Sequence, residues 1–157
     1  MRGVWIICIV SLALAGCGEK TDEQLIKNAQ EAVAKELASK YKPGECDNWK
    51  FMEAGGAISK GPAIAVCDDS FNVSKGLTFT GIKVYRHEHR DVVCGIVSGH
   101  TDISRIGARF VYTAGDNKMV TIKKSKEPVL GRGKDPTSIE LMKLLRNQFD
   151  MVVRDCQ

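Results

Sequence analysis

The stretch LTFTGIKVYRHEHRDVVCGIVS, residues 77–98, decides the fold. Apolar residues alternate with polar ones in two runs that a charged segment separates, which is the pattern of two antiparallel strands joined by a turn. The apolar residues before Gly81 and those after it have opposite parity, so a bulge at Gly81 would bring them to one face. The residues concerned are Leu77 and Phe79 before the glycine and Ile82 and Val84 after it.

Short apolar runs bounded by Gly, Pro, Asn and Asp continue on both sides of this stretch. The sequence predicts strands at Ala63–Cys67, Leu77–Tyr85, Val92–Ser98, Ala108–Thr113 and Met119–Lys123. The last two are separated by AGDNK, residues 114–118, whose length and composition suit a hairpin loop. We therefore expect an antiparallel sheet of four to five strands.

A helix is predicted before this sheet. Thr21 and Gln24 form a capping box, and Pro43 with Gly44 ends the helix. Between them, apolar residues recur at every fourth position: Leu25, Ala29, Val33, Leu37 and Tyr41. This stripe favours a helix packed on the sheet over a solvated arm near a membrane.

A second helix is predicted after the sheet, with Asp135 as its N-cap and Pro136 at its first position. Its apolar side chains follow at spacings of three and four residues: Met142, Leu145, Phe149, Val152 and Cys156. The expected fold class is α+β, with an N-terminal helix, the antiparallel sheet, and a C-terminal helix packed on the sheet. A composition of 43% hydrophobic and 27% charged residues fits one soluble globular domain.

The first sixteen residues have the layout of a secretory signal. Arg2 precedes an apolar run, residues 4–14, that is too short to cross a bilayer core. The segment ends in LAGC, residues 14–17, which resembles the lipobox of bacterial lipoproteins. This resemblance implies cleavage before Cys17, diacylglycerol on its sulfur and acylation of the new amino terminus. An ordinary signal peptide with a chance cysteine is the alternative.

The expected organisation is a signal peptide over residues 1–16, a lipidated tether over 17–22 and a single periplasmic α+β domain over 23–157. Two or three acyl chains on Cys17 would hold the chain stably in the lipid bilayer. Gly18 stands where inner-membrane lipoproteins of enterobacteria usually carry Asp. The resemblance therefore implies an anchor in the outer membrane, facing the periplasm.

Four of the six cysteines remain once Cys8 leaves with the signal and Cys17 is acylated: Cys46, Cys67, Cys94 and Cys156. An even number in an oxidising compartment predicts two disulfides. A metal site is less favoured, because no C-x₂-C pair is present. Of the three possible pairings, we favour Cys46 with Cys67 and Cys94 with Cys156. The reason is that Cys156 points with the apolar stripe of its helix toward a central strand, which carries Cys94.

The formal net charge is +4, and it falls to +3 when Arg2 leaves with the signal. A charge this small gives no reason to expect nucleic-acid binding and fits a protein that works near an anionic envelope. Gly131–Lys134 forms a basic loop together with Lys123, Lys124 and Lys126. We interpret it as a solvated connection before the last helix, with contact to anionic lipid or an acidic protein as the alternative.

No catalytic, metal or cofactor site is predicted. His87 and His89 would share one face of an extended segment and suit copper or zinc, but the charged residues around them favour a solvated turn. His100 lies in a polar loop near Ser98 and Ser104, without the nucleophile elbow that a serine hydrolase would show.

Two stretches of the domain carry a resemblance. Residues 93–97 (VCGIV) and 107–112 (GARFVY) resemble the V-C-G-x-V … G-x-x-x-F-[IV]-Y stretch of small bacterial and phage lipoproteins of uncharacterised function. The chain departs from them at Ile96, where an acidic residue is usual, and at residues 98–100, where their turn is Asn-rich. A competing resemblance, through residues 107–110, is to membrane-bound inhibitors of lysozyme, although two long helices fit their all-β barrel poorly.

The sequence therefore predicts a membrane-anchored, non-enzymatic binding module of the cell envelope. Its expected partner is another envelope protein, and an exposed sheet edge or loop face is the natural surface for it. The alternatives are a periplasmic inhibitor of a lysozyme-like hydrolase and a toxin-immunity lipoprotein. A metal-dependent or hydrolytic enzyme is a third hypothesis.

Overall fold

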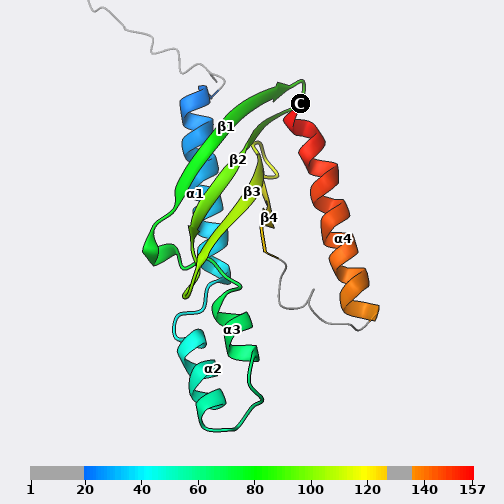
Figure 1. Ribbon diagram of the computed structural model, residues 1–157. Helices are drawn as coiled ribbons and strands as arrows, with labels where there is room; N and C mark the ends of the chain where they lie inside the picture. The colour runs from blue at the N-terminus through cyan, green and yellow to red at the C-terminus, as the bar shows by residue number, and fades with distance from the viewer. Residues whose placement is uncertain (1–19, 127–135) are drawn as a thin grey trace, which may run out of the picture.

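The computed structural model describes residues 20–126 and 136–157 and has the predicted α+β architecture (Figure 1). The helices are α1 (Asp22–Lys40), α2 (Glu45–Ala54), α3 (Pro62–Cys67) and α4 (Pro136–Val152), with short 3₁₀ turns η1 (Val73–Lys75) and η3 (Val153–Cys156). The strands are β1 (Thr78–His87), β2 (Arg90–His100), β3 (Arg105–Thr113) and β4 (Met119–Lys124). No described helix is both long and apolar enough to span a membrane.

The four strands form one antiparallel sheet in the order β1-β2-β3-β4. Each strand pairs with its neighbour in sequence, because short turns connect them. The predicted bulge at Gly81 is confirmed: the register between β1 and β2 shifts between Thr80 and Lys83, and Gly81 has φ +60°. As a result, the apolar residues on both sides of the bulge pack into the same core: Leu77, Phe79, Ile82 and Val84.

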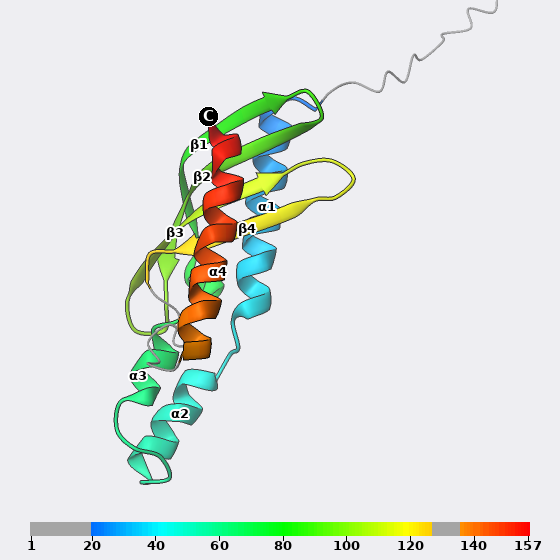
Figure 2. The same cartoon turned by 90° about the vertical axis from the view of Figure 1, so that its right-hand side faces the viewer.

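Helix α1 covers one face of the sheet (Figure 2). Its N-terminus has the predicted capping box, in which Thr21 and Gln24 each accept a hydrogen bond from the other's backbone N–H. The stripe at every fourth position is buried: Leu25, Ala29, Val33 and Leu37. It packs on the side chains of β2 and β3 that point to this face of the sheet, including Val93, Val97, Phe110 and Tyr112. This is the main hydrophobic core.

Helix α4 lies on the opposite face, above a smaller core that Val92, Val111 and Phe149 form. Phe149 is the one residue of α4 that is buried, with 2% of its surface exposed. The Arg109 guanidinium lies 5.7 Å and the Lys123 ammonium 5.4 Å from the centroid of its ring. The disulfide Cys94–Cys156 fixes the end of this helical segment to β2. The predicted packing of the C-terminal helix on the sheet is thus confirmed for its last turns.

One predicted strand is wrong. Residues 63–67 belong to helix α3, which begins at Pro62, and the sheet has four strands. A short apolar run does not distinguish a strand from a helix, whereas the Gly61-Pro62 pair before it is a helix start. Helix α2 was not predicted at all. The signal segment, Cys17, Gly18, the basic loop Gly131–Lys134 and the N-cap Asp135 lie outside the described residues.

Candidate interaction surface

Helices α2 and α3 form a hairpin that projects from one end of the sheet (Figure 1). The disulfide Cys46–Cys67 joins the two helices, with Cα atoms 4.7 Å apart, and both cysteines are buried. The start of α1 lies at the other end of the molecule. Lys20, the first described residue, therefore lies at the end opposite this hairpin.

Local interactions define the shape of the hairpin. Helix α2 follows Gly44, which has φ +80° and turns the chain sharply after α1. The Glu53 carboxylate accepts hydrogen bonds from the backbone N–H groups of Gly61 at 2.9 Å and Ala63 at 2.6 Å. These groups lie at the N-terminus of α3, where free N–H groups favour a negative charge. Glu53 thus caps α3 from the neighbouring helix.

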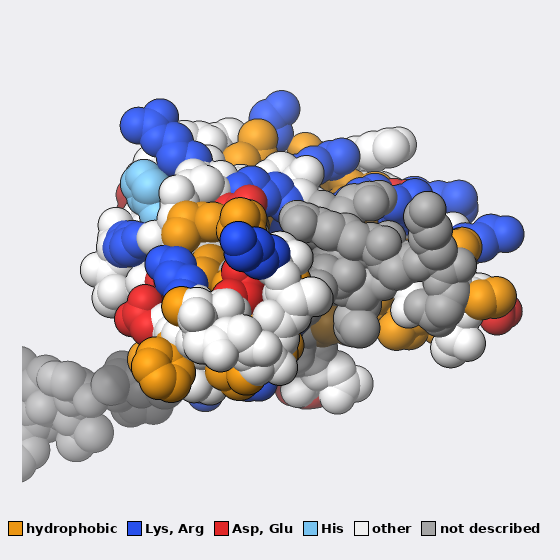
Figure 3. Space-filling view, turned by 60° about the horizontal axis from the view of Figure 1, so that its bottom comes forward, with side chains coloured by type: hydrophobic (Ala, Val, Ile, Leu, Met, Phe, Trp, Pro, Cys, Tyr) orange, Lys and Arg blue, Asp and Glu red, His pale blue; other side chains and the backbone are white. Residues whose placement is uncertain are grey.

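The hairpin exposes large apolar side chains. Phe51 on α2 is 78% exposed and Ile64 on α3 is 65% exposed. Neither belongs to the two hydrophobic cores of the described residues. Figure 3 turns this end of the molecule toward the viewer and shows hydrophobic side chains on it among charged ones. Phe51 and Ile64 are therefore the large apolar side chains that the hairpin leaves exposed to solvent.

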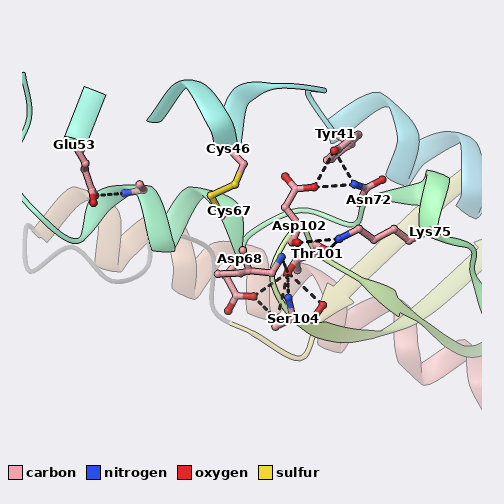
Figure 4. The surroundings of a disulfide bond; sticks show 12 residues. Tyr41, Cys46, Glu53, Cys67, Asp68, Asn72, Lys75, Thr101, Asp102 and Ser104 are labelled. Atoms are coloured by element: carbon pink, nitrogen blue, oxygen red, sulfur yellow. Dashed lines mark hydrogen bonds between the residues drawn. A yellow bond between two sulfur atoms is a disulfide. The ribbon is translucent and has the colours of Figure 1, made fainter. Parts of the chain in front are cut away.

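A first polar cluster at the base of the hairpin is centred on Asp102 (Figure 4). Its Oδ1 accepts hydrogen bonds from the Tyr41 hydroxyl at 2.9 Å and from Asn72 Nδ2 at 2.7 Å. The Lys75 ammonium donates to the backbone carbonyls of Thr101 and Asp102. Desolvation, followed by the hydrogen bond to Asp102, raises the pKa of Tyr41. The cluster fixes the end of α1 to the turn between β2 and β3.

A second polar cluster, centred on Asp68, fixes the end of α3 to the same turn. Asp68 Oδ1 accepts hydrogen bonds from Thr101 at 3.0 Å, from Lys126 at 2.7 Å and from Ser104. Desolvation opposes ionisation of Asp68, but the hydrogen bonds from Lys126, Ser104 and Thr101 outweigh it and hold its pKa below the ordinary value. Buried side-chain polar atoms in the described part of the chain all have partners.

The second cluster also brings a serine and a lysine together. Lys126 also contacts the Ser104 hydroxyl, a pairing that would suit a serine nucleophile with a lysine base. Lys126 also donates a hydrogen bond to the Asp68 carboxylate, so the three side chains form one cluster. Ser104 donates to Asp68 and has no contact with His100 among its hydrogen bonds.

The other predicted positions are placed as follows. The disulfides Cys46–Cys67 and Cys94–Cys156 are present, in the favoured pairing. His87 Nε2 lies 2.8 Å from the Asp155 carbonyl, and no group of three or more possible metal ligands occurs in residues 20–126 and 136–157. The lysines predicted to form a basic loop pair with carboxylates of the chain: Lys123 with Asp150, Lys124 with Asp69 and Lys126 with Asp68.

The sequence analysis missed the hairpin and both polar clusters. The Gly61-Pro62 pair and the Asp-Asp-Ser segment after Cys67 were the available signals, since such residues mark helix ends and turns. Comparison of the chain with models of protein families, with curated proteins and with solved structures finds no match.

Proposed function

We propose that this chain is a lipoprotein of the bacterial envelope that binds another envelope protein through the α2–α3 hairpin and performs no chemistry itself. The observation that carries the proposal is the position of the hairpin. It projects from the end of the domain opposite the start of α1, with Phe51 and Ile64 exposed on it. Acylated Cys17 would hold the other end of the domain at the lipid bilayer.

The use of a disulfide supports this role. The hairpin contributes only Cys46, Ala63 and Cys67 as buried apolar residues of α2 and α3. An element with so little buried surface does not hold its own shape by hydrophobic burial. The cross-link and the Glu53 cap fix it instead. A rigid apolar projection loses little conformational entropy when it binds, which favours affinity.

The tether determines where the hairpin can reach. Cys17 precedes α1 by a few polar residues, so the proposed anchor keeps the domain close to the membrane. The hairpin then faces away from the bilayer. With Gly18 after the cysteine, we place the anchor in the outer membrane, with the domain in the periplasm and a protein partner there; nucleic acid is not expected.

The test is an affinity pull-down from crosslinked envelopes of the host with three chains: the unmodified chain, the Phe51→Ser, Ile64→Ser double variant and a Met119→Ser control. Met119 is 42% exposed on β4, outside the hairpin. We expect one envelope protein with the unmodified chain and the control, and at least tenfold less of it with the double variant. Equal recovery with all three chains would exclude the hairpin as the binding surface.

The anchor is tested separately by mass spectrometry of the mature chain. We expect cleavage before Cys17, and a mass increase from two or three acyl chains that is absent in Cys17→Ser. A mature chain with an unmodified Cys17 would contradict the lipoprotein proposal and leave the hairpin test unaffected.

A hydrolase of the lysozyme type is the second candidate partner. A narrow projection with an apolar side chain at 78% exposure suits insertion into an enzyme cleft, as the inhibitor hypothesis requires. Added to a lysis assay, the chain would slow clearing, and Phe51→Ser would abolish the delay. If the rate of clearing did not change, the envelope partner would not be a lysozyme-like hydrolase.

A further inference from the structure

The acidic and basic residues of the four described strands are divided unequally between the two faces of the sheet. Side chains alternate between faces along a strand, and residues paired across strands share a face. Because Val92 and Val111 pack with Phe149 of α4, the register places the following residues on the α4 face: Lys83, His87, Arg90, His100, Arg105, Arg109 and Lys123. The one acidic residue of these strands, Asp91, lies on the α1 face.

Only part of this positive charge is paired. The Lys123 ammonium lies 3.2 Å from Asp150 Oδ1, and the Arg90 guanidinium lies 2.7 Å from Asp155 Oδ2. Three further cations on this face are exposed and form no ion pair within the described residues, and we call them the basic patch: Lys83, Arg105 and Arg109. Uncompensated charge on one face attracts a partner of opposite charge.

Helix α4 borders the basic patch with apolar side chains. Asp150 pairs with a lysine of β4, whereas Val152 packs in the same cluster as Cys94 of β2. The side of α4 that carries Val152 therefore faces the β1–β2 half of the sheet. Residues three and four positions apart share a side of a helix, so Leu145 and Leu141 lie on this side as well. Their side chains are 47% and 43% exposed.

The β1–β2 half of this face has room for one more helix. In Figure 1 the last turns of α4 lie beside the strands, and the helix diverges from them toward Pro136. Four strands about 4.8 Å apart make a sheet about 19 Å wide, whereas a helix is about 10 Å wide, so one helix covers about half of the face. In the uncovered half Ile96 is 45% exposed, with Thr80 and Arg109 as its partners on the neighbouring strands.

We propose that the uncovered part of the α4 face binds an acidic amphipathic helix of a partner protein, which lies on the sheet beside α4. Its apolar side chains pack on Ile96, Leu141 and Leu145, as the apolar face of a helix does on a receiving surface. Its carboxylates pair with the basic patch, whose two guanidinium groups suit carboxylate oxygens. The proposal rests on the proposed binding role, but it uses different residues from the hairpin.

Other occupants complement this surface less well. A second copy related by a twofold axis would bring two basic patches together, which is unfavourable. Residues 127–135 contain two acidic and two basic residues, so they offer no net negative charge. Arg105 follows the β2–β3 turn, whereas the Lys20 carbonyl accepts a hydrogen bond from Arg86 near the other end of the strands. The proposed anchor therefore holds Arg105 at the end of the sheet away from the bilayer.

The probe is a fluorescein-labelled helical peptide, EELAELLEELAELLEE, titrated into the full chain in phosphatidylcholine nanodiscs and followed by fluorescence anisotropy, with empty nanodiscs as the blank. The test variant is Lys83→Glu, Arg105→Glu, and its control, Lys27→Glu, Lys35→Glu, makes the same charge change on the exposed side of α1. We expect saturable binding that weakens at least tenfold in the test variant and less than about threefold in the control. Absence of binding, or equal weakening in both variants, would overturn the proposal.

The apolar contacts are tested by a second matched pair. Ile139 is 56% exposed and precedes Asp150 by three turns, so it lies on the β4 side of α4. Leu145→Ser should weaken peptide binding at least threefold, and Ile139→Ser should leave it unchanged. Equal effects would overturn the proposed position of the helix. The Phe51→Ser, Ile64→Ser variant should bind the peptide normally, which separates this test from that of the hairpin.

Acetylation of lysines, quantified by mass spectrometry, identifies the occupant in the same samples. Saturating peptide should slow acetylation of Lys83 at least tenfold and leave Lys27 and Lys35 unchanged. Protection of Lys83 without peptide would overturn the proposal and name another occupant. Dependence on chain concentration would indicate a second copy, dependence on added phosphatidylglycerol would indicate the bilayer, and dependence on neither would indicate the chain itself.

Discussion

At the residue scale, Asp68 and Asp102 have similar structural roles at the base of the hairpin. Each carboxylate collects hydrogen bonds from two or three segments that are distant in sequence, and each fixes a helix end to the turn between β2 and β3. A charged acceptor with several donors forms stronger hydrogen bonds than a neutral one. The two carboxylates therefore position the hairpin relative to the sheet without any apolar core between them.

Replacing Asp68 by Asn should lower the free energy of unfolding by about 1–3 kcal/mol at pH 7, because three donors lose a charged acceptor. The pKa of Asp68 is lowered in the folded chain, so its carboxylate stabilises the fold above the unfolded pKa of about 3.9. This contribution is lost as the pH falls through the folded pKa. Urea denaturation at pH 7, 5 and 3 should show the gap between the two chains closing; a constant gap would contradict a role for the charge.

Two phenylalanines should respond in opposite ways to truncation. Phe149 is 2% exposed beneath Arg109 and Lys123, so Phe149→Ala should lower the free energy of unfolding by about 3–5 kcal/mol. Phe51 is 78% exposed, and Phe51→Ala should change the free energy of unfolding by less than about 0.5 kcal/mol. Chemical denaturation of both variants checks this. A large loss of stability in Phe51→Ala would mean that Phe51 supports the fold, which would contradict its proposed role in binding a partner.

At the element scale, the strands illustrate what sequence patterns specify. Alternation places β1 to β4 within a few residues, and the parity change around Gly81 predicts the bulge, because the core admits one face of each strand. The same patterns do not separate the short α3 from a strand. Nor do they show Phe51 and Ile64 to be exposed, since burial depends on how far the hairpin stands from the sheet. The Asp68 cluster joins residues from α3, the β2–β3 turn and the end of β4, a juxtaposition that only the topology creates.

Two glycines of the sheet should resist substitution for different reasons. Gly81 has φ +60° and open space around a built Cβ, so Gly81→Ala should cost about 1–2 kcal/mol through the backbone alone. At Gly95 a Cβ would lie 2.8 Å from Phe110 Cζ, and Gly95→Ala should cost about 1–3 kcal/mol through overpacking.

A double-mutant cycle with Phe110→Leu separates the two mechanisms. The shorter side chain should relieve part of the cost at Gly95 and none at Gly81, so a coupling energy of about 0.5–3 kcal/mol is expected for the first pair alone. Coupling at Gly81 of the same size would show that its cost also comes from packing.

At the scale of the whole molecule, the two disulfides hold parts that the main core does not. Cys46–Cys67 closes 21 residues in the hairpin, and Cys94–Cys156 closes 62 residues and holds α4 on the sheet. The core between α1 and the sheet includes none of these cysteines. The sheet with α1 should therefore unfold as one unit, and the hairpin and α4 as separate, less stable ones.

Removing each disulfide should release its own part of the molecule. With Cys46→Ser and Cys67→Ser, trypsin should cut first in the hairpin, at Lys50 or Lys60, while α4 stays protected; the cross-link would contribute about 3 kcal/mol by chain entropy. With Cys94→Ser and Cys156→Ser, the first cuts should move to α4, at Lys143 or Arg146, while the hairpin stays intact. Limited proteolysis followed by mass spectrometry identifies the first cuts in each variant, and the positions of these cuts are then compared. Because the hairpin and α4 rest on different cross-links, identical first cuts in the two variants would mean that the domain unfolds as a single unit, and that the hairpin is not held independently of the core.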